Sequence, residues 1–171
     1  MALRNIVKKG DEVLTKKCRV VTDFNPRLHK LLDDMRETLL NSGGVGLAAP
    51  QVGVLRRAVL VIDTNQEEEP VIELINPEIV EREGEQEGPE GCLSIPNVWG
   101  IVKRPEKVRV RAQDRNGEFF EVEGEGLTAR AFCHELDHLE GVLFDELADH
   151  IMSQEELDEY YGSGSDGDGD E

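Results

Sequence analysis

Two histidines, with a glutamate directly after the first, form the part of the sequence best suited to chemistry. The segment reads His134-Glu135-Leu136-Asp137-His138. On an α-helix, residues i and i+4 lie on one face about one turn apart, so both imidazoles can reach a single divalent ion. The Glu135 carboxylate would stay free to act on a water molecule at that ion. Such a helix needs a third metal ligand from elsewhere in the chain.

Three sources of a third ligand can be compared. One class of metalloprotease extends the motif to H-E-x-x-H-x-x-G-x-x-H, but Phe144 occupies the last position, which excludes that class. A zinc peptidase could instead use a downstream glutamate, and this alternative stays open with Glu155, Glu156 and Glu159. The better candidate is Cys92, in the segment Glu90-Gly91-Cys92-Leu93-Ser94. Two imidazoles and one thiolate leave a fourth position for water at a catalytic ion.

Three motifs together make the chain resemble the peptide deformylase family. They are Gly-Val-Gly-Leu-Ala-Ala-Pro-Gln at 44–51, Glu-Gly-Cys-Leu-Ser at 90–94 and His-Glu-Leu-Asp-His-Leu-Glu-Gly at 134–141. They occur in the family's order and at about its spacing, and the match extends from the N-terminus to about residue 150. Members of this family are metallohydrolases that remove the formyl group from the N-terminal methionine of new bacterial proteins. The resemblance therefore implies deformylation, with formate as one product.

The resemblance implies a metal centre and a proton-transfer group. Cys92, His134 and His138 match the family's metal ligands, and Glu135 matches its general base and acid. The family generally prefers iron(II), and a thiolate suits a soft transition metal, although zinc, nickel or cobalt could occupy the same ligands. Glu135 would accept a proton from the attacking water and return it to the leaving amine.

The resemblance also implies the groups that would bind the substrate, an N-formylmethionyl peptide of a nascent chain. The Gln51 amide and the backbone N–H of Leu93 match donors that stabilise negative charge on the formyl oxygen. An apolar pocket suits the unbranched thioether of methionine, and a glycine would let the substrate backbone approach closely. The residues matched to these roles are Val45, Gly46, Leu127 and Ala131.

Some of these residues also allow simpler interpretations. A free cysteine such as Cys92 is most often a small buried hydrophobe, and the glycine-rich segment 44–51 could be a packing loop. Asp137 could orient a metal ligand or be a solvated helix charge. Cys18 and Cys133 are expected to be inert thiols; Cys133 stands where the family commonly has glutamine. The alternative from another functional class is an inactive relative that binds peptides or partner proteins, which the intact catalytic set disfavours.

Composition indicates a single enzyme domain. The chain has 171 residues and a formal charge of -18, and a phosphate backbone would be repelled by such a charge, which argues against a nucleic-acid surface. Three cysteines without framework spacing indicate a reducing compartment. Neither a membrane-spanning run nor the apolar segment of a signal peptide is found, so we expect a bacterial cytoplasmic location.

Hydrophobic patterns predict an α+β fold, with mostly antiparallel strands packed around the central helix that carries the two histidines. Asn25 and Pro26 are typical of a helix start, and Asn116-Gly117 is a hairpin signal. One helix is predicted to begin near 26, a second to span 127–140 and a third to begin after 153. The predicted strands are 58–62, 71–80 with a break at Pro77, 107–112 and 119–122.

The C-terminus is expected to differ from the rest of the chain. Residues 1–161 would form one domain, and 162–171 would be an acidic, disordered tail. Relatives can dock on the ribosome through a longer, more basic C-terminal helix. The acidic residues Asp166, Asp168, Asp170 and Glu171 should repel ribosomal RNA, so at most weak ribosome association is expected.

Overall fold

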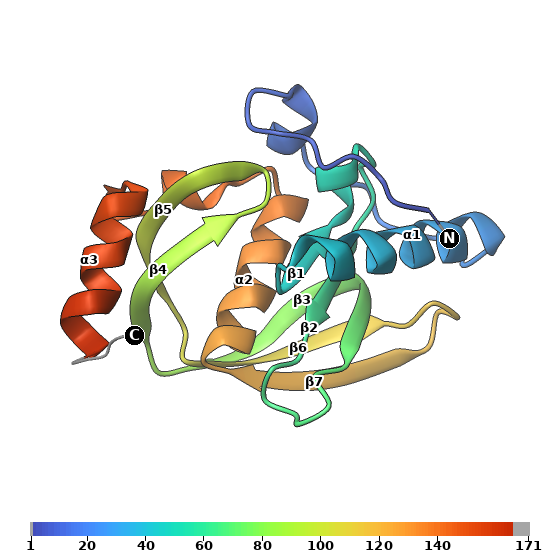
Figure 1. Ribbon diagram of the computed structural model, residues 1–171. Helices are drawn as coiled ribbons and strands as arrows, with labels where there is room; N and C mark the ends of the chain where they lie inside the picture. The colour runs from blue at the N-terminus through green and yellow to red at the C-terminus, as the bar shows by residue number, and fades with distance from the viewer. Residues whose placement is uncertain (1, 166–171) are drawn as a thin grey trace.

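A computed structural model describes residues 2–165 (Figure 1). The 3-10 helices in that range are η1 (Glu12–Thr15), η2 (Ala49–Val52) and η3 (Phe144–Glu146). The α-helices are α1 (Pro26–Ser42), α2 (Leu127–Leu139) and α3 (Gln154–Ser165). The strands are β1 (Gly46–Ala48), β2 (Ala58–Ile62), β3 (Val71–Glu83), β4 (Gln86–Cys92), β5 (Ile95–Arg104), β6 (Lys107–Gln113), β7 (Phe119–Glu125) and β8 (His150–Met152).

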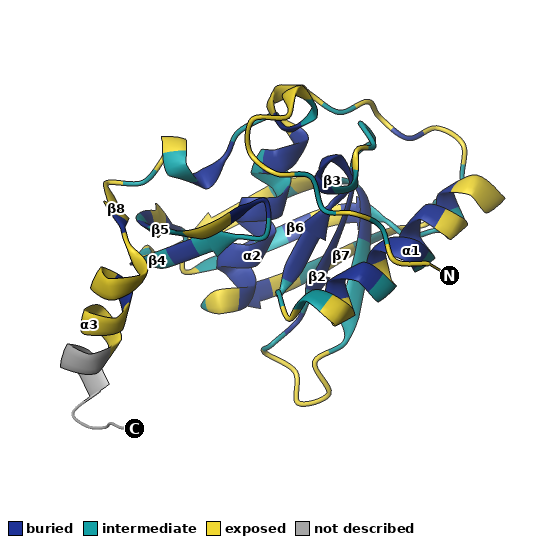
Figure 2. Cartoon of the chain, turned by 45° about the horizontal axis from the view of Figure 1, so that its top comes forward, coloured by how far each residue is buried: buried dark blue, intermediate teal, exposed yellow. Residues whose placement is uncertain are grey.

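Within residues 2–165, the strands form two antiparallel sheets. One has the order β1-β2-β3-β6-β7, and the other has the order β4-β5-β8. Helix α2 lies between the two sheets, and its side chains pack into the core of the larger one (Figures 1 and 2). The predicted α+β class, with antiparallel strands around the histidine-bearing helix, is therefore confirmed.

Helix α1 begins at the predicted residue. The Asn25 side chain accepts a hydrogen bond from the Leu28 N–H at 3.1 Å, and Pro26 is the first helical residue. Gly43 ends the helix in the left-handed conformation, with φ 78°. Its apolar stripe is buried against β2 and β3 in a cluster that includes Leu28, Leu31, Leu32, Met35, Leu39, Ala58, Leu60 and Ile75.

Strand β3 continues through Pro77 instead of breaking there. The register with β6 shifts between Ile75 and Glu78, so the proline lies at an irregularity where a ladder hydrogen bond is not required of it. Asn76 has φ 52°, and its side chain exchanges hydrogen bonds with the backbone of Val21 at 2.8 and 2.9 Å. The bulge thus preserves pairing on both sides of the proline.

The predicted hairpin of β6 and β7 is present, but its loop is longer than a two-residue Asn-Gly turn. The loop spans 114–118 and is closed by Asp114, whose carboxylate accepts from the N–H groups of Asn116 and Glu118. Gly117 adopts φ 86°. The hairpin ends directly before α2, and its Gly124 lets that helix approach, because a Cβ there would lie 2.6 Å from the Thr128 side chain.

The smaller sheet and its covering helix complete the fold. Strands β4 and β5 form a hairpin that the hydrophobic pattern did not predict, and Cys92 ends β4. A capping box precedes α3: the Ser153 hydroxyl accepts from the Glu156 N–H at 3.2 Å, and the Glu156 carboxylate accepts from the Ser153 N–H at 3.0 Å. Helix α3 extends to Ser165, into the segment expected to be a tail, and the remaining residues 166–171 lie outside the described part. No helix in the described part is long and apolar enough to cross a membrane.

Candidate metal centre

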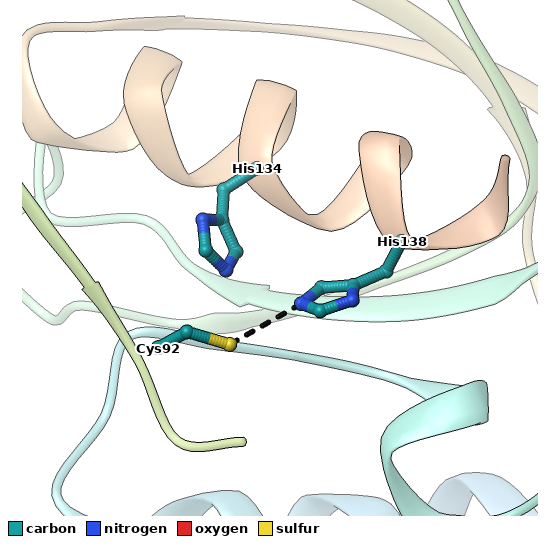
Figure 3. A group of neighbouring side chains, drawn as sticks. All are labelled: Cys92, His134 and His138. Atoms are coloured by element: carbon teal, nitrogen blue, oxygen red, sulfur yellow. Dashed lines mark hydrogen bonds between the residues drawn. The ribbon is translucent and has the colours of Figure 1, made fainter. Parts of the chain in front are cut away.

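Three side chains predicted as metal ligands converge between the two sheets. His134 and His138 lie one turn apart on the buried face of α2, and Cys92 reaches them from the end of β4 (Figure 3). The Cys92 Sγ is 3.4 Å from the His138 Nε2, and the three donor atoms lie within 4.8 Å of one another. This donor set is the one expected of a catalytic site that keeps a fourth position for water or substrate.

The downstream glutamates do not join this cluster. Among the described residues, the group of donor atoms close enough to share an ion consists of Cys92 and the two histidines. Glu155 and Glu156 are exposed on α3, and the Glu156 carboxylate accepts a hydrogen bond from the Ser153 N–H. The zinc-peptidase alternative, which needed one of these glutamates as the third ligand, is therefore not supported.

A buried carboxylate orients the first histidine. Glu90 Oε2 lies 2.5 Å from His134 Nδ1, which leaves the Nε2 atom of that ring for the metal. The same carboxylate accepts hydrogen bonds from Arg104 at 2.7 and 3.1 Å and from Arg130 at 2.9 Å. Arg104 also donates to Asp137 at 2.7 Å. Asp137 thus partners a buried arginine, and no hydrogen bond from it to a metal ligand is found in residues 2–165.

These contacts set the charges around the site. Burial opposes ionisation of Glu90, but hydrogen bonds from His134 and Arg104 hold the pKa of that carboxyl at about 2. Burial alone would lower the pKa of His134, yet hydrogen bonds to Cys92 and Glu90 raise it well above its ordinary value. The negative charge of Glu90 also favours a metal cation nearby. Burial, followed by the charge of His134, lowers the pKa of His138 to about 3, so this ring is held in the neutral form that binds metals.

Glu135 has the surroundings of a proton-transfer group. Its side chain is buried, and burial raises the pKa of its carboxyl to about 7. Among the described residues, its Oε1 atom has no hydrogen-bond partner. Its Oε2 atom lies against Gly46, where an added Cβ would approach within 2.6 Å. The carboxylate is thus packed on one side and has one oxygen free to exchange a proton.

Gln51 directs its amide group toward the same place. Its Oε1 accepts from the Ala48 N–H at 2.9 Å, which fixes the orientation of the amide. Its Nε2 donates to Ser94 at 3.1 Å and lies 3.6 Å from the Cys92 sulfur. An amide nitrogen carries two hydrogens, so the one that Ser94 does not accept points toward the Cys92 sulfur, where a substrate oxygen would compete for it.

One cavity of about 500 Å³ is lined by Gln51, Cys92, His134 and Glu135, and its size is typical of a small-ligand pocket. The four residues matched to substrate binding, together with Leu93, lie on its wall. They come from three separate segments, the start of β1, the β4–β5 turn and α2. The predicted site residues in this wall are Val45, Gly46, Leu93, Leu127 and Ala131.

Comparison with known proteins gives the family. The profile of the family described as polypeptide deformylase matches residues 3–155. The chain belongs to the polypeptide deformylase family. A deformylase from Caldicellulosiruptor bescii is 56% identical over 159 residues, which cover 93% of each chain. The crystal structure of the Thermotoga maritima deformylase superimposes with a TM-score of 0.82 at 38% identity, covering 88% of this chain and 100% of that one.

A further deformylase structure, from Acinetobacter baumannii, carries bound Met-Ala-Ser. It is 35% identical, with a TM-score of 0.79, and the match covers 85% of this chain and 98% of that one. The protein described here is accordingly a peptide deformylase in function, a metal-dependent hydrolase that removes the formyl group from N-terminal formylmethionine and releases formate. Its substrates are N-formylmethionyl peptides.

Four residues around the site were not assigned a role from the sequence. Glu90 lay inside a recognised motif, and its neighbour Cys92 was the signal that could have pointed to it. Arg104 and Arg130 carry no comparable signal, because their charges are compensated only by contacts between distant segments. Trp99 lines the cavity from β5, a strand that the hydrophobic pattern did not indicate.

Proposed function

We propose that Cys92, His134 and His138 bind the catalytic metal and that Glu135 transfers protons during deformylation. The observation that carries this assignment is the convergence of the three donor atoms, two of them on residues that line the same cavity as the buried Glu135. When bound, a divalent ion with this ligand set lowers the pKa of a water molecule and polarises the formyl group.

Glu135 would act first as a base and then as an acid. A carboxyl with a pKa of about 7 can accept the proton of the attacking water near neutral pH and can then give it to the leaving nitrogen. The packing of Glu135 against Gly46 limits where this carboxylate can lie. The proton would thus stay within the cavity between attack and departure of the amine.

Gln51 and Leu93 would stabilise the negative charge that develops on the formyl oxygen. The Gln51 amide is held by Ala48 and Ser94, so its other N–H is oriented toward the Cys92 sulfur before the substrate arrives. The backbone N–H of Leu93 would be the second donor. Both donors are neutral, so neither competes with the metal for its ligands.

The wall formed by Val45, Leu127 and Ala131 would receive the methionine side chain of the formyl peptide. The Met-Ala-Ser bound to the Acinetobacter baumannii deformylase has the sequence expected of a deformylated product, which supports a methionyl peptide as the ligand here. The backbone of Gly46 would lie along the substrate peptide. Nascent chains would supply these substrates.

We expect iron(II) to be the native metal, because the ligand set contains a thiolate and the family generally uses this ion; zinc, nickel or cobalt could occupy the same donors. We also expect the enzyme to act in the bacterial cytoplasm. Any ribosome association should be weak, because the acidic residues after Ser165 repel RNA.

Formate release from N-formyl-Met-Ala-Ser tests the proposal. The protein would be stripped of metal and reloaded without oxygen with iron(II), nickel(II), cobalt(II) or zinc(II), and formate and the new amine would be measured together. We expect one formate per amine, activity that depends on the metal, and loss of the iron form in air as Cys92 is oxidised. Equal activity of the stripped and loaded protein would contradict the proposed role of the metal.

A further inference from the structure

The cavity extends beyond the space that formylmethionine needs. Its volume is about 500 Å³. A formylmethionyl group has about ten non-hydrogen atoms, and at the roughly 30 Å³ that a water molecule occupies in the liquid they fill at most about 300 Å³. The remaining volume can therefore hold part of the peptide that follows the methionine.

Two aromatic side chains line this cavity in addition to the proposed catalytic groups. Trp99 is supplied by β5, and Tyr161 is supplied by α3. Tyr161 is 57% exposed, and Trp99 is half-buried, so both present ring surface to a ligand. Among the described residues lining the cavity, the charged side chains are all buried, namely Glu90, Arg130, His134 and Glu135.

Trp99 is held in place from two sides. A Cβ on Gly91 would lie 2.4 Å from the Trp99 ring, so the ring rests directly on the backbone next to the ligand Cys92. On the other side, the Trp99 Nε1 donates to Gln154 at the start of α3, at 3.2 Å. A ring fixed in this way loses little freedom when a ligand packs on it.

We propose that Trp99 and Tyr161 form an aromatic subsite for one of the two residues that follow the formylmethionine. The inference rests on the proposed function, because the methionine must occupy the inner part of the cavity. The occupant is the substrate's own chain, since the two rings and the proposed catalytic groups line one continuous cavity. Successive side chains of an extended peptide point to opposite sides, so one of residues two and three faces the rings and the other faces away.

The test uses formyl peptides that differ at one position. Turnover of N-formyl-Met-Ala-Ala would be compared with that of peptides carrying phenylalanine or leucine at position two or three. An added aromatic contact is worth ~0.5–1.5 kcal/mol, so phenylalanine at one of these positions should raise kcat/KM by roughly 2- to 10-fold. Phenylalanine at the other position should have little effect.

Variants then assign the preference to the two rings. Trp99→Ala and Tyr161→Ala should bring the ratio of kcat/KM for the phenylalanine and alanine peptides toward one, and Trp99→Phe should keep most of it. Phe119→Ala removes a ring that is also exposed, on β7 outside the cavity, and should leave the ratio unchanged. Because Tyr161 is exposed, its substitution gives an answer even if Trp99→Ala folds poorly.

A wild-type enzyme with equal kcat/KM for all these peptides would overturn the subsite. A preference for phenylalanine that survives both Trp99→Ala and Tyr161→Ala would also overturn it. Failure of the proposed function would be distinct, because the wild-type protein would then release no formate even from N-formyl-Met-Ala-Ala.

Discussion

Glu90 and His134 are separated by 44 positions in the chain, yet their side chains meet at 2.5 Å between Oε2 and Nδ1. The contact joins the end of β4 to the middle of α2, so it links the two segments that supply the metal ligands. A histidine whose Nδ1 is held by a carboxylate has its Nε2 oriented toward the metal, and its basicity as a ligand is increased. The proposed metal centre therefore depends on a residue that touches no metal.

The first prediction concerns this carboxylate. Glu90→Gln keeps the shape of the side chain but removes the charge that faces His134 and the buried Arg104 and Arg130. Metal affinity should fall by roughly 10- to 100-fold, the range for losing an outer partner of a histidine ligand. Competition with a chelator measures the metal affinity. Glu87→Gln, at an exposed position on the same strand, is the control. Unchanged affinity in a folded Glu90→Gln variant would show that the contact does not support the metal.

Removal of the thiolate should have a larger effect. Cys92→Ala takes away one of three ligands. Metal affinity should therefore fall by more than the roughly 10- to 100-fold that is typical of losing a residue that only holds a ligand in place. Cys18→Ala is the control, because burial raises the pKa of the Cys18 thiol to about 11 and keeps it protonated. Metal analysis of the two purified variants decides the matter. Full occupancy of Cys92→Ala would remove this residue from the ligand set.

Gly46 should matter for the position of Glu135. In Gly46→Ala the new Cβ would approach the Glu135 Oε2 to 2.6 Å, so the carboxylate must move. We expect kcat to fall by about 10²-fold, as for a misplacement of about 1 Å, while the metal stays bound. Gly88→Ala, whose Cβ would lie 3.6 Å from Arg130, should be tolerated. Normal kcat with raised KM in Gly46→Ala would instead point to a role in substrate binding alone.

The N-terminal segment should respond to acid through Asp34. Burial opposes its ionisation, but hydrogen bonds from the Ala2 N–H and from Arg4 and Lys30 hold the pKa of Asp34 below its ordinary 3.8. The folded-state pKa is the lower one, so the stabilisation is present above about pH 3.8 and is lost as the pH falls through the folded value. Asp34→Asn should flatten the acid limb of a stability–pH curve, whereas Asp23→Asn, at an exposed position, should not. Parallel acid limbs for wild type and Asp34→Asn would contradict this.

Most elements of the fold could be predicted where local signals are strong. The cap at Asn25, the alternation in β6 and β7, and the spacing of the two histidines on α2 depend on neighbours in sequence, and each corresponds to an element found. The break predicted at Pro77 was wrong, because a proline argues against a continuous strand. The bulge that accommodates it is visible only in the pairing of β3 with β6. Strands β4 and β5 carry glycines, prolines and charges that obscure the alternation.

The site could be predicted in part, and for a similar reason. The convergence of Cys92 with the two histidines could be predicted because the segments that carry them together match the motifs of one family. The buried charges of Arg104 and Arg130 could not be anticipated, because such residues are normally exposed and become buried only when a carboxylate from another segment meets them. The aromatic part of the cavity likewise depends on how α3 lies against β5.

The most direct test of the account is the metal content and turnover of Glu135→Gln, measured on the same sample. The substitution is nearly isosteric and removes the ability to accept a proton. The account predicts metal occupancy equal to that of the wild type and turnover of N-formyl-Met-Ala-Ser lower by roughly 10²- to 10⁴-fold, with a much smaller change in substrate affinity. Near-normal turnover with bound metal would contradict it, since another group would then have to transfer the proton, and loss of the metal would make Glu135 a ligand or a structural anchor.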